Sequence, residues 1–287
     1  MFKTEKKLAG WHIILALSSL SIGAFFGPLQ AWEHAGWNTY PAMQPYIASY
    51  YHGLTLHGIL NALAFTTFFI TGFLTYITAT SLGRPMRYPK LSWAGFFTMV
   101  FGLILAAVPL LLNLASILYT MYPPMMAPWY FYVGMTLFVV GSWMSGWNMM
   151  ITFANWRKDN PGETAPFQAF ASVITMALWQ ICTLGIAAEM LLLIIPWSLG
   201  LVPGIDVQLA RTLFWFTGHP LVYFWLLPAY ISWYGMMPKQ AGGKLFSGTM
   251  ARFAFWLFLL LSTPIGFHHQ YVDPGVPAGW KYLHAVL

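Results

Sequence analysis

The sequence predicts an all-α protein that crosses a membrane several times, and three observations lead to this fold class. Of the 287 residues, 59% are hydrophobic and only 7% are charged, whereas soluble domains use about 25% charged residues. The apolar residues form runs long enough to cross a hydrocarbon core of about 30 Å as helices. The cations gather in every second loop between these runs. We therefore predict a polytopic membrane helix bundle.

Seven apolar runs account for the predicted helices. The first runs from Leu8 to Ala31 and is too long for the apolar part of a secretory signal peptide. The predicted helices begin near Leu8, Tyr51, Leu91, Ala127, Phe167, Val207 and Met250. Proline and glycine lie between the runs, for example at 83–85 and 160–162, which is typical of turns. We predict about seven transmembrane helices in a single membrane domain, residues 1–287.

The distribution of lysine and arginine predicts the orientation of the bundle. Of the thirteen cations, those at the N-terminus and in the second, fourth and sixth loops fall on one side of the membrane: Lys3, Lys6, Lys7, Arg84, Arg87, Lys90, Arg157, Lys158, Lys239, Lys244 and Arg252. Arg211 and Lys281 fall on the other side. The cation-rich side of a membrane protein is cytoplasmic, so we place the N-terminus in the cytoplasm. The net charge of +6 then reflects membrane topology, and we expect lipid and no nucleic acid as a partner.

Four histidines lie in the outer half of the predicted bundle: His57, His219, His268 and His269. Ionisable groups at membrane depth are costly and usually functional. One such histidine alone is as readily explained by a hydrogen bond to a neighbouring helix. An adjacent pair with a third histidine at similar depth favours a metal site. Three imidazoles without a thiolate or a carboxylate suit copper, zinc or iron.

The helix that carries the adjacent histidines needs a distortion to direct both at one ion. Successive residues of an α-helix point about 100° apart. Pro264 removes a backbone donor and Gly266 loosens the next turn, while Pro220 disturbs the helix beside His219.

A polar stripe runs inward from the sixth predicted span. His219, Tyr223, Tyr230 and Tyr234 are separated by 4, 7 and 4 positions, which places them within roughly 60° of one another on a helix. The stripe is a candidate proton path from the cytoplasm to the metal site, although Tyr234 also fits an aromatic belt. Glu189 is an intramembrane carboxylate away from this stripe, for which functional and structural roles are both open.

Two segments resemble subunit I of the haem-copper oxidases, namely residues 215–223 (WFTGHPLVY) and 263–270 (TPIGFHHQ). The resemblance covers the whole chain and implies a copper ion held by His219, His268 and His269 opposite a high-spin haem. It implies that Tyr223 is covalently joined to His219 and supplies an electron and a proton to oxygen. It implies that His57 is an axial ligand of a low-spin haem.

One departure within these motifs indicates a subgroup. Mitochondrial-type members carry a glutamate directly after the Gly-His-Pro motif, where this chain has Leu221. The chain therefore resembles the B-type oxidases of prokaryotes, in which the tyrosine stripe is the single proton intake. Nitric oxide reductases of the same superfamily lack a tyrosine at the position of Tyr223.

The length of the chain is a second departure, because full subunit I continues through several more spans. We interpret the sequence as the first seven spans of a longer catalytic subunit, either a fragment or part of a split subunit, which needs a C-terminal half for activity. The resemblance implies that the assembly lies in a prokaryotic plasma membrane, reduces dioxygen to water and translocates protons. It also implies that electrons come from cytochrome c or a similar donor through a subunit II with a binuclear copper centre.

Three other interpretations remain open at the level of sequence. One is a nitric oxide reductase of the same superfamily. Another is a membrane transporter for metal or protons whose histidines line a pathway. The third is a remnant that cannot assemble haem.

Overall fold

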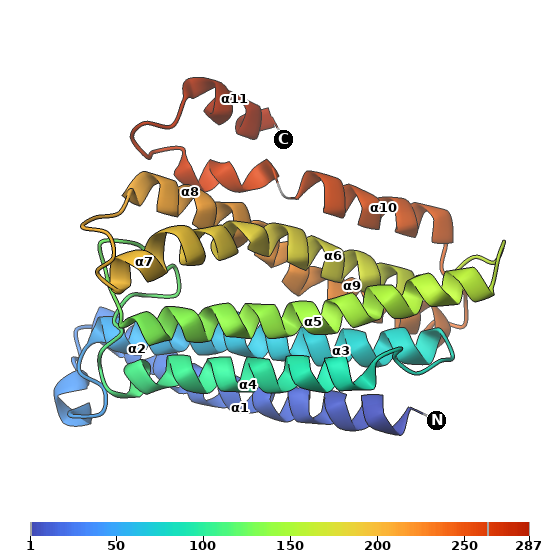
Figure 1. Ribbon diagram of the computed structural model, residues 1–287, viewed down its shortest axis with the longest axis horizontal. Helices are drawn as coiled ribbons and strands as arrows, with labels where there is room; N and C mark the ends of the chain where they lie inside the picture. Colours follow the sequence, from blue (N-terminus) through green and yellow to red (C-terminus); the bar gives the residue numbers. More distant parts are fainter. Residues whose placement is uncertain (1, 263, 287) are drawn as a thin grey trace.

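The computed structural model describes residues 2–262 and 264–286, and the regular secondary structure in that part of the chain is helical. Seven long segments run back and forth along one direction (Figure 1). They comprise α1 (Lys3–His34), α2–η2–α3 (Tyr50–Gly58, Ile59–Phe65, Thr66–Ser81), α4 (Pro89–Leu111), α5 (Trp129–Asp159), α6–η3–α7 (Phe167–Ala188, Glu189–Ile194, Ile195–Ser198), α8–α9 (Val207–Gly218, Pro220–Gln240) and α10–η4 (Gly248–Leu261, Pro264–Gln270). The short helices η1 (Tyr40–Met43) and α11 (Ala278–Val286) lie outside these segments.

The fold class predicted from sequence is confirmed, and each long segment begins within about five residues of its predicted start. In the described part of the chain, five segments are long and apolar enough to cross a membrane by length and composition. The other two long segments, α5 and α8–α9, are not among these five, and α8–α9 is interrupted at His219. The N-terminus and the turns α3–α4, α5–α6 and α9–α10 gather at one end of the bundle (Figure 1). The cation-rich loops therefore share one end, as the predicted orientation requires.

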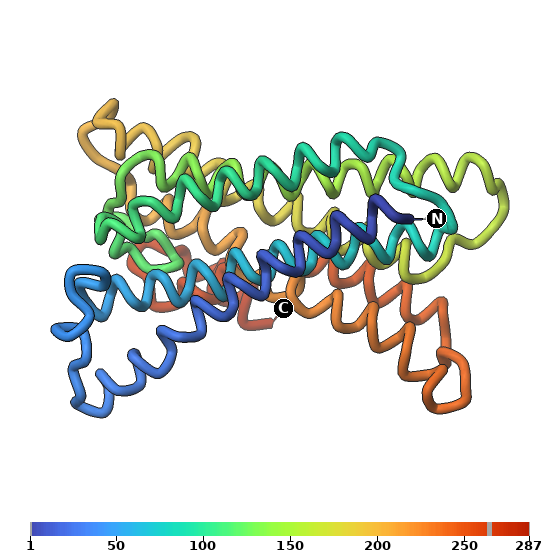
Figure 2. Tube along the Cα trace, turned by 90° about the horizontal axis from the view of Figure 1, so that it is seen from below, coloured from blue at the N-terminus to red at the C-terminus, as the bar shows by residue number. Residues whose placement is uncertain are grey.

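Small residues set the spacing of neighbouring helices. A Cβ on Gly102 of α4 would lie 2.5 Å from the carbonyl oxygen of Gly134 in α5, and one on Gly141 would lie 2.5 Å from the carbonyl oxygen of Gly95. Only glycine permits this approach, which is a common way for membrane helices to gain packing contacts. α1 lies along α2 and α3 on one face of the bundle (Figure 2). Farther along the bundle, Trp179 of α6 stacks on Phe224 of α9 with ring centroids 4.3 Å apart.

Three of the long segments depart from α-helical geometry near the candidate site residues. The segment η2 is a π-helix that begins two residues after His57, and η3 is a π-helix that begins at Glu189. The segment η4, which contains His268 and His269, is a 3-10 helix. Such irregular turns are frequent at functional sites.

Candidate metal centre

His219 lies at a break between two helices. α8 ends at Gly218 and α9 begins at Pro220, as the proline predicts. A proline at the first position of a helix is favourable, because the backbone N–H that it lacks would have no partner in the helix. At this break His219 faces η4, and its Nδ1 lies 3.1 Å from Nε2 of His269.

Gly266 brings η4 against α8. A Cβ at this position would lie 2.2 Å from the carbonyl oxygen of Trp215 and 3.4 Å from Cβ of His219. The predicted distortion beside the adjacent histidines is confirmed, since Pro264–Gln270 forms a 3-10 helix. Thr263 of the same motif lies outside the described residues.

The three histidines form one cluster. His219, His268 and His269 each offer a ring nitrogen, and these three atoms lie within 4.8 Å of one another. The ring centroids of His219 and His268 are 4.4 Å apart, as are those of His268 and His269. Two imidazole nitrogens bound to one ion at about 2.0–2.1 Å in tetrahedral geometry would be separated by about 3.3 Å, which is close to the 3.1 Å between Nδ1 of His219 and Nε2 of His269. The donor set and the spacing therefore fit copper, zinc or iron.

Trp215 holds the orientation of one of these rings. Its indole stacks on His269 with centroids 3.7 Å apart and an angle of 4° between the planes. Trp215 is part of the motif that precedes His219, yet no role was predicted for it. Trp215 lies four residues before His219, which is about one helical turn. This spacing is the feature of the sequence that could have indicated a contact with the metal cluster.

Tyr223 lies beside the cluster. Its hydroxyl oxygen is 3.0 Å from Nε2 of His219, so the two ring nitrogens of His219 have different neighbours. If Nδ1 gives its lone pair to a metal ion, the neutral ring carries its proton on Nε2 and donates it to the tyrosine oxygen. The structure therefore places the predicted tyrosine in contact with the first histidine.

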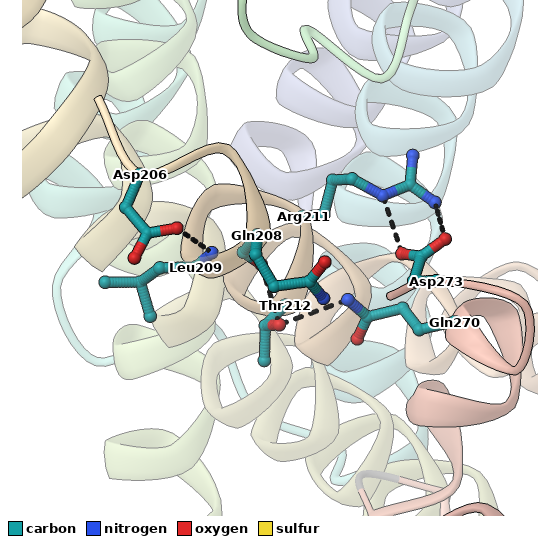
Figure 3. A network of polar contacts seen from close by, with 7 residues as sticks. All are labelled: Asp206, Gln208, Leu209, Arg211, Thr212, Gln270 and Asp273. Atoms are coloured by element: carbon teal, nitrogen blue, oxygen red, sulfur yellow. Dashed lines mark hydrogen bonds and ion pairs between the residues drawn. The ribbon is translucent and has the colours of Figure 1, made fainter. Parts of the chain in front are cut away.

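Polar contacts tie η4 to α8 at the outer end of the bundle. Arg211 donates from Nε and Nη2 to the carboxylate of Asp273, at 2.8 and 3.0 Å. Gln270 donates to the hydroxyl of Thr212 at 3.1 Å, and Asp206 caps α8 (Figure 3). These bonds fix the position of the adjacent histidines against His219.

The loop between α4 and α5 also contacts this network. The guanidinium carbon of Arg211 lies 4.4 Å from the ring centroid of Tyr122. Burial raises the pKa of Tyr122 above its usual value, and the charge of Arg211 opposes that rise. The neutral phenol ring is thus a cation–π partner for the arginine.

His57 is separate from the cluster of three histidines. Its Nδ1 lies 2.9 Å from the carbonyl oxygen of Gly23 in α1. A carbonyl only accepts, so the proton lies on Nδ1 and the lone pair of Nε2 is free for a ligand. The predicted role of His57 as a haem ligand would use this nitrogen.

An apolar cavity of about 260 Å³ reaches the cluster from the bundle interior. Its lining includes Trp215 and His269, together with Met135, Trp143 and Leu191. The cavity leads to the histidines through apolar surroundings and suits a small apolar molecule.

The three tyrosines of the predicted stripe share α9. Tyr230 and Tyr234 stack with centroids 6.2 Å apart at 14°. The ring of Phe258 in α10 contacts both Tyr223 and Tyr230, at centroid distances of 5.7 and 6.1 Å. The positions of the three tyrosines on α9 agree with the helical spacing. Because the ring of Phe258 is apolar, a proton that moves from Tyr230 to Tyr223 needs a bridging polar group.

Glu189 is fully buried, and both carboxylate oxygens are without a hydrogen-bond partner in the described part of the chain. It lies at the start of the π-helix η3. An unpartnered ionised carboxylate is too costly at this depth, so Glu189 is protonated. Glu189 is not one of the residues that form the histidine cluster.

The fold and the histidine cluster together define a helical membrane protein with three histidines that could hold a metal ion. Over residues 7–287 the chain matches the family described as "Cytochrome C and Quinol oxidase polypeptide I". The chain belongs to this family of haem-copper oxidase subunits I, whose members hold haem and copper.

Individual relatives agree with this assignment. Cytochrome c oxidase subunit 1 of Thermus thermophilus is 46% identical over 287 residues, covering 99% of this chain and 51% of the relative. The heme-copper oxidase subunit I+III of Aeropyrum pernix is 26% identical, covering 78% of this chain and 29% of the relative. A chain from a cryo-EM structure of a heme-copper terminal oxidase dimer superimposes with a TM-score of 0.94 at 41% identity, covering all of this chain and 49% of that chain. The chain thus spans about half the length of its two most similar relatives named here.

Proposed function

We propose that the chain supplies the copper-binding half of the catalytic subunit of a terminal oxidase that reduces dioxygen to water with electrons from cytochrome c. The observation that carries this proposal is the cluster of three imidazoles within 4.8 Å, with the hydroxyl of Tyr223 3.0 Å from one of them. In the complete assembly His219, His268 and His269 would hold copper, and His57 would hold a low-spin haem. The cofactors, copper and two haems, supply the electron transfer to dioxygen when bound.

The residues of this chain would act by position and by proton transfer. Dioxygen is small and apolar, and the cavity of about 260 Å³ beside Trp215 and His269 offers it a route within the bundle. Tyr223, in contact with His219, is placed to give its phenolic proton to the substrate. Tyr230 and Tyr234 lie on the same helix toward the end that carries the cations, and with bridging water they would return a proton to Tyr223.

The remaining partners follow from the same proposal. The C-terminal half of subunit I brings the ligands that this chain lacks, and a subunit II with a binuclear copper centre brings electrons from cytochrome c. The assembly lies in a prokaryotic plasma membrane and couples the reaction to proton translocation.

The test uses the chain assembled with its C-terminal half and subunit II. Tyr223→Phe removes the phenolic proton, so we expect oxygen consumption with reduced cytochrome c to fall at least 100-fold while copper content and reduction of the low-spin haem stay unchanged. Tyr76→Phe is the matched control, because Tyr76 is half-buried in α3 and far along the chain from the cluster. Normal oxygen consumption in the Tyr223→Phe assembly would contradict the proposal.

The same preparation separates the alternative functions. His219→Asn removes one imidazole, and we expect it to abolish copper retention, whereas His34→Gln at the exposed end of α1 leaves copper in place. Metal transport without haem absorbance in the wild-type assembly would identify a transporter. Reduction of nitric oxide to nitrous oxide with negligible reduction of dioxygen would identify a nitric oxide reductase.

A further inference from the structure

The surroundings of His57 contain a second polar side chain, Asn61, that neither the motif nor the metal cluster explains. Nδ2 of Asn61 lies 3.2 Å from Nδ1 of His57. The same Nδ1 is 2.9 Å from the carbonyl oxygen of Gly23. We propose that Asn61 is a positioning residue for the haem ligand, with its side-chain oxygen and the Gly23 carbonyl both accepting the proton on Nδ1 of His57. This inference rests on the proposed role of His57.

The contact with Gly23 depends on the absence of a side chain in α1. A Cβ at this position would lie 2.3 Å from Oδ1 of Asn61 and 2.9 Å from Cβ of Leu60. Gly27, one turn farther along α1, likewise faces His57, and a Cβ there would lie 3.3 Å from its Cε1. The two glycines therefore let the backbone of α1 reach the imidazole.

The orientation of the Asn61 amide follows from hydrogen-bond chemistry. Because the Gly23 carbonyl only accepts, Nδ1 of His57 carries the proton, and the amide NH2 of Asn61 cannot donate to it. In the other tautomer, with the proton on Nε2, the lone pair of Nδ1 would face a lone pair of the Gly23 carbonyl oxygen. The proton on Nε2 would also block the nitrogen that binds iron. Exchanging the oxygen and nitrogen of the amide keeps its shape and places an acceptor 3.2 Å from the N–H. Oδ1 is buried and accepts no hydrogen bond in the described part of the chain, so the exchange breaks no hydrogen bond at that atom.

The backbone of η2 supports this arrangement. Asn61 follows His57 by four residues and lies within the π-helix Ile59–Phe65. Residues four apart share a helix face, so the amide lies beside the imidazole of the preceding turn. Asn61 and Gly23 thus approach the same nitrogen from two different helices.

Acceptors on the distal N–H of a ligating imidazole have a known effect. They fix the tautomer and raise the basicity of the ligand, and their loss typically changes metal affinity 10–100-fold. A more basic ligand favours ferric over ferrous iron. Removing the acceptor at Asn61 therefore favours reduction of the haem.

The experiment compares three variants in the complete assembly. Asn61→Leu has a similar volume and no acceptor, and we expect the equilibrium of the low-spin haem to move tenfold toward reduction, which is an upward shift of about 59 mV for one electron. The EPR g-values of the ferric haem move with it. Asn61→Asp is isosteric and keeps an oxygen acceptor, so its potential stays at or below the wild-type value even if the leucine variant fails to assemble. Thr71→Val, which removes a buried unpartnered hydroxyl from the same span, leaves the potential and the g-values unchanged.

The outcomes separate this inference from the proposed function. An unchanged potential and unchanged g-values in Asn61→Leu, or a raised potential in Asn61→Asp, would overturn the role of Asn61. A low-spin haem signal that persists in His57→Ala would instead overturn the assignment of His57 as the ligand. Loss of that signal in His57→Ala, together with a raised potential in Asn61→Leu and a potential at or below the wild-type value in Asn61→Asp, supports both.

Discussion

Gly266→Ala tests whether the contact between η4 and α8 sets the geometry of the metal centre. The new Cβ would lie 2.2 Å from the carbonyl oxygen of Trp215, and ordinary contact begins at 3.4 Å. The neighbouring atom belongs to the backbone of α8, so the two segments must separate by about 1.2 Å. Metal–ligand distances tolerate deviations of about 0.2 Å, and His269 and His219 are carried by the two segments that separate.

We expect this variant to keep its low-spin haem and to lose copper. Overpacking costs about 1–3 kcal/mol, which the bundle as a whole tolerates, whereas affinity for copper falls at least tenfold. The assay is the ratio of copper to haem in the purified assembly, by elemental analysis and optical spectroscopy. Gly10→Ala is the control, because a Cβ there meets no atom within 4 Å. A stoichiometric copper content in Gly266→Ala would refute the reasoning, since η4 would then be free to shift without moving its histidines.

Three further predictions concern the surroundings of the cluster. Trp215→Leu removes the ring that stacks on His269, and we expect copper to dissociate about tenfold faster in a chelator exchange assay. Unaltered exchange would show that the stack does not orient the ligand. Asp273→Asn removes the ionic partner of Arg211, whose side chain is 25% exposed, so we expect a loss of about 2 kcal/mol, measured by thermal unfolding. An unshifted transition would contradict this value. Tyr230→Phe is expected to slow proton uptake in flow-flash measurements while copper content stays normal; wild-type uptake rates would exclude Tyr230 from the path.

Much of the helical framework was predictable because long apolar runs in a membrane have few alternatives to the helix. The break at His219 was also predictable, since Pro220 removes a backbone donor within an apolar run. The 3-10 geometry of η4 could be anticipated only as a distortion near Gly266. Its form depends on how closely the backbone of Trp215 approaches, and that contact joins segments far apart in the sequence.

Other features had no local signal. Neither π-helix contains a proline or glycine, and Gly58 and Pro196, which lie beside them, do not distinguish a π-helix from a kinked α-helix. Asn61 is an isolated asparagine in an apolar run, and its significance depends on Gly23, a residue 38 positions earlier in the chain. The helical period could place the tyrosines on one face, but it could not reveal that Phe258 from α10 contacts both Tyr223 and Tyr230.

Each candidate ligand lies at or next to a departure from regular α-helix, and the two sites rely on different supports. The 3-10 helix that carries His268 and His269 has seven residues, longer than the three or four that such helices usually sustain. It is stabilised by contacts with α8, namely those of Gly266 and the ion pair of Asp273. His57 depends instead on the carbonyl of Gly23 in α1. No residue is common to the two sets of contacts, so we expect a mutation in one set to act on one site alone. Copper loss in Gly266→Ala and a shifted haem potential in Asn61→Leu therefore report on separate parts of the proposal.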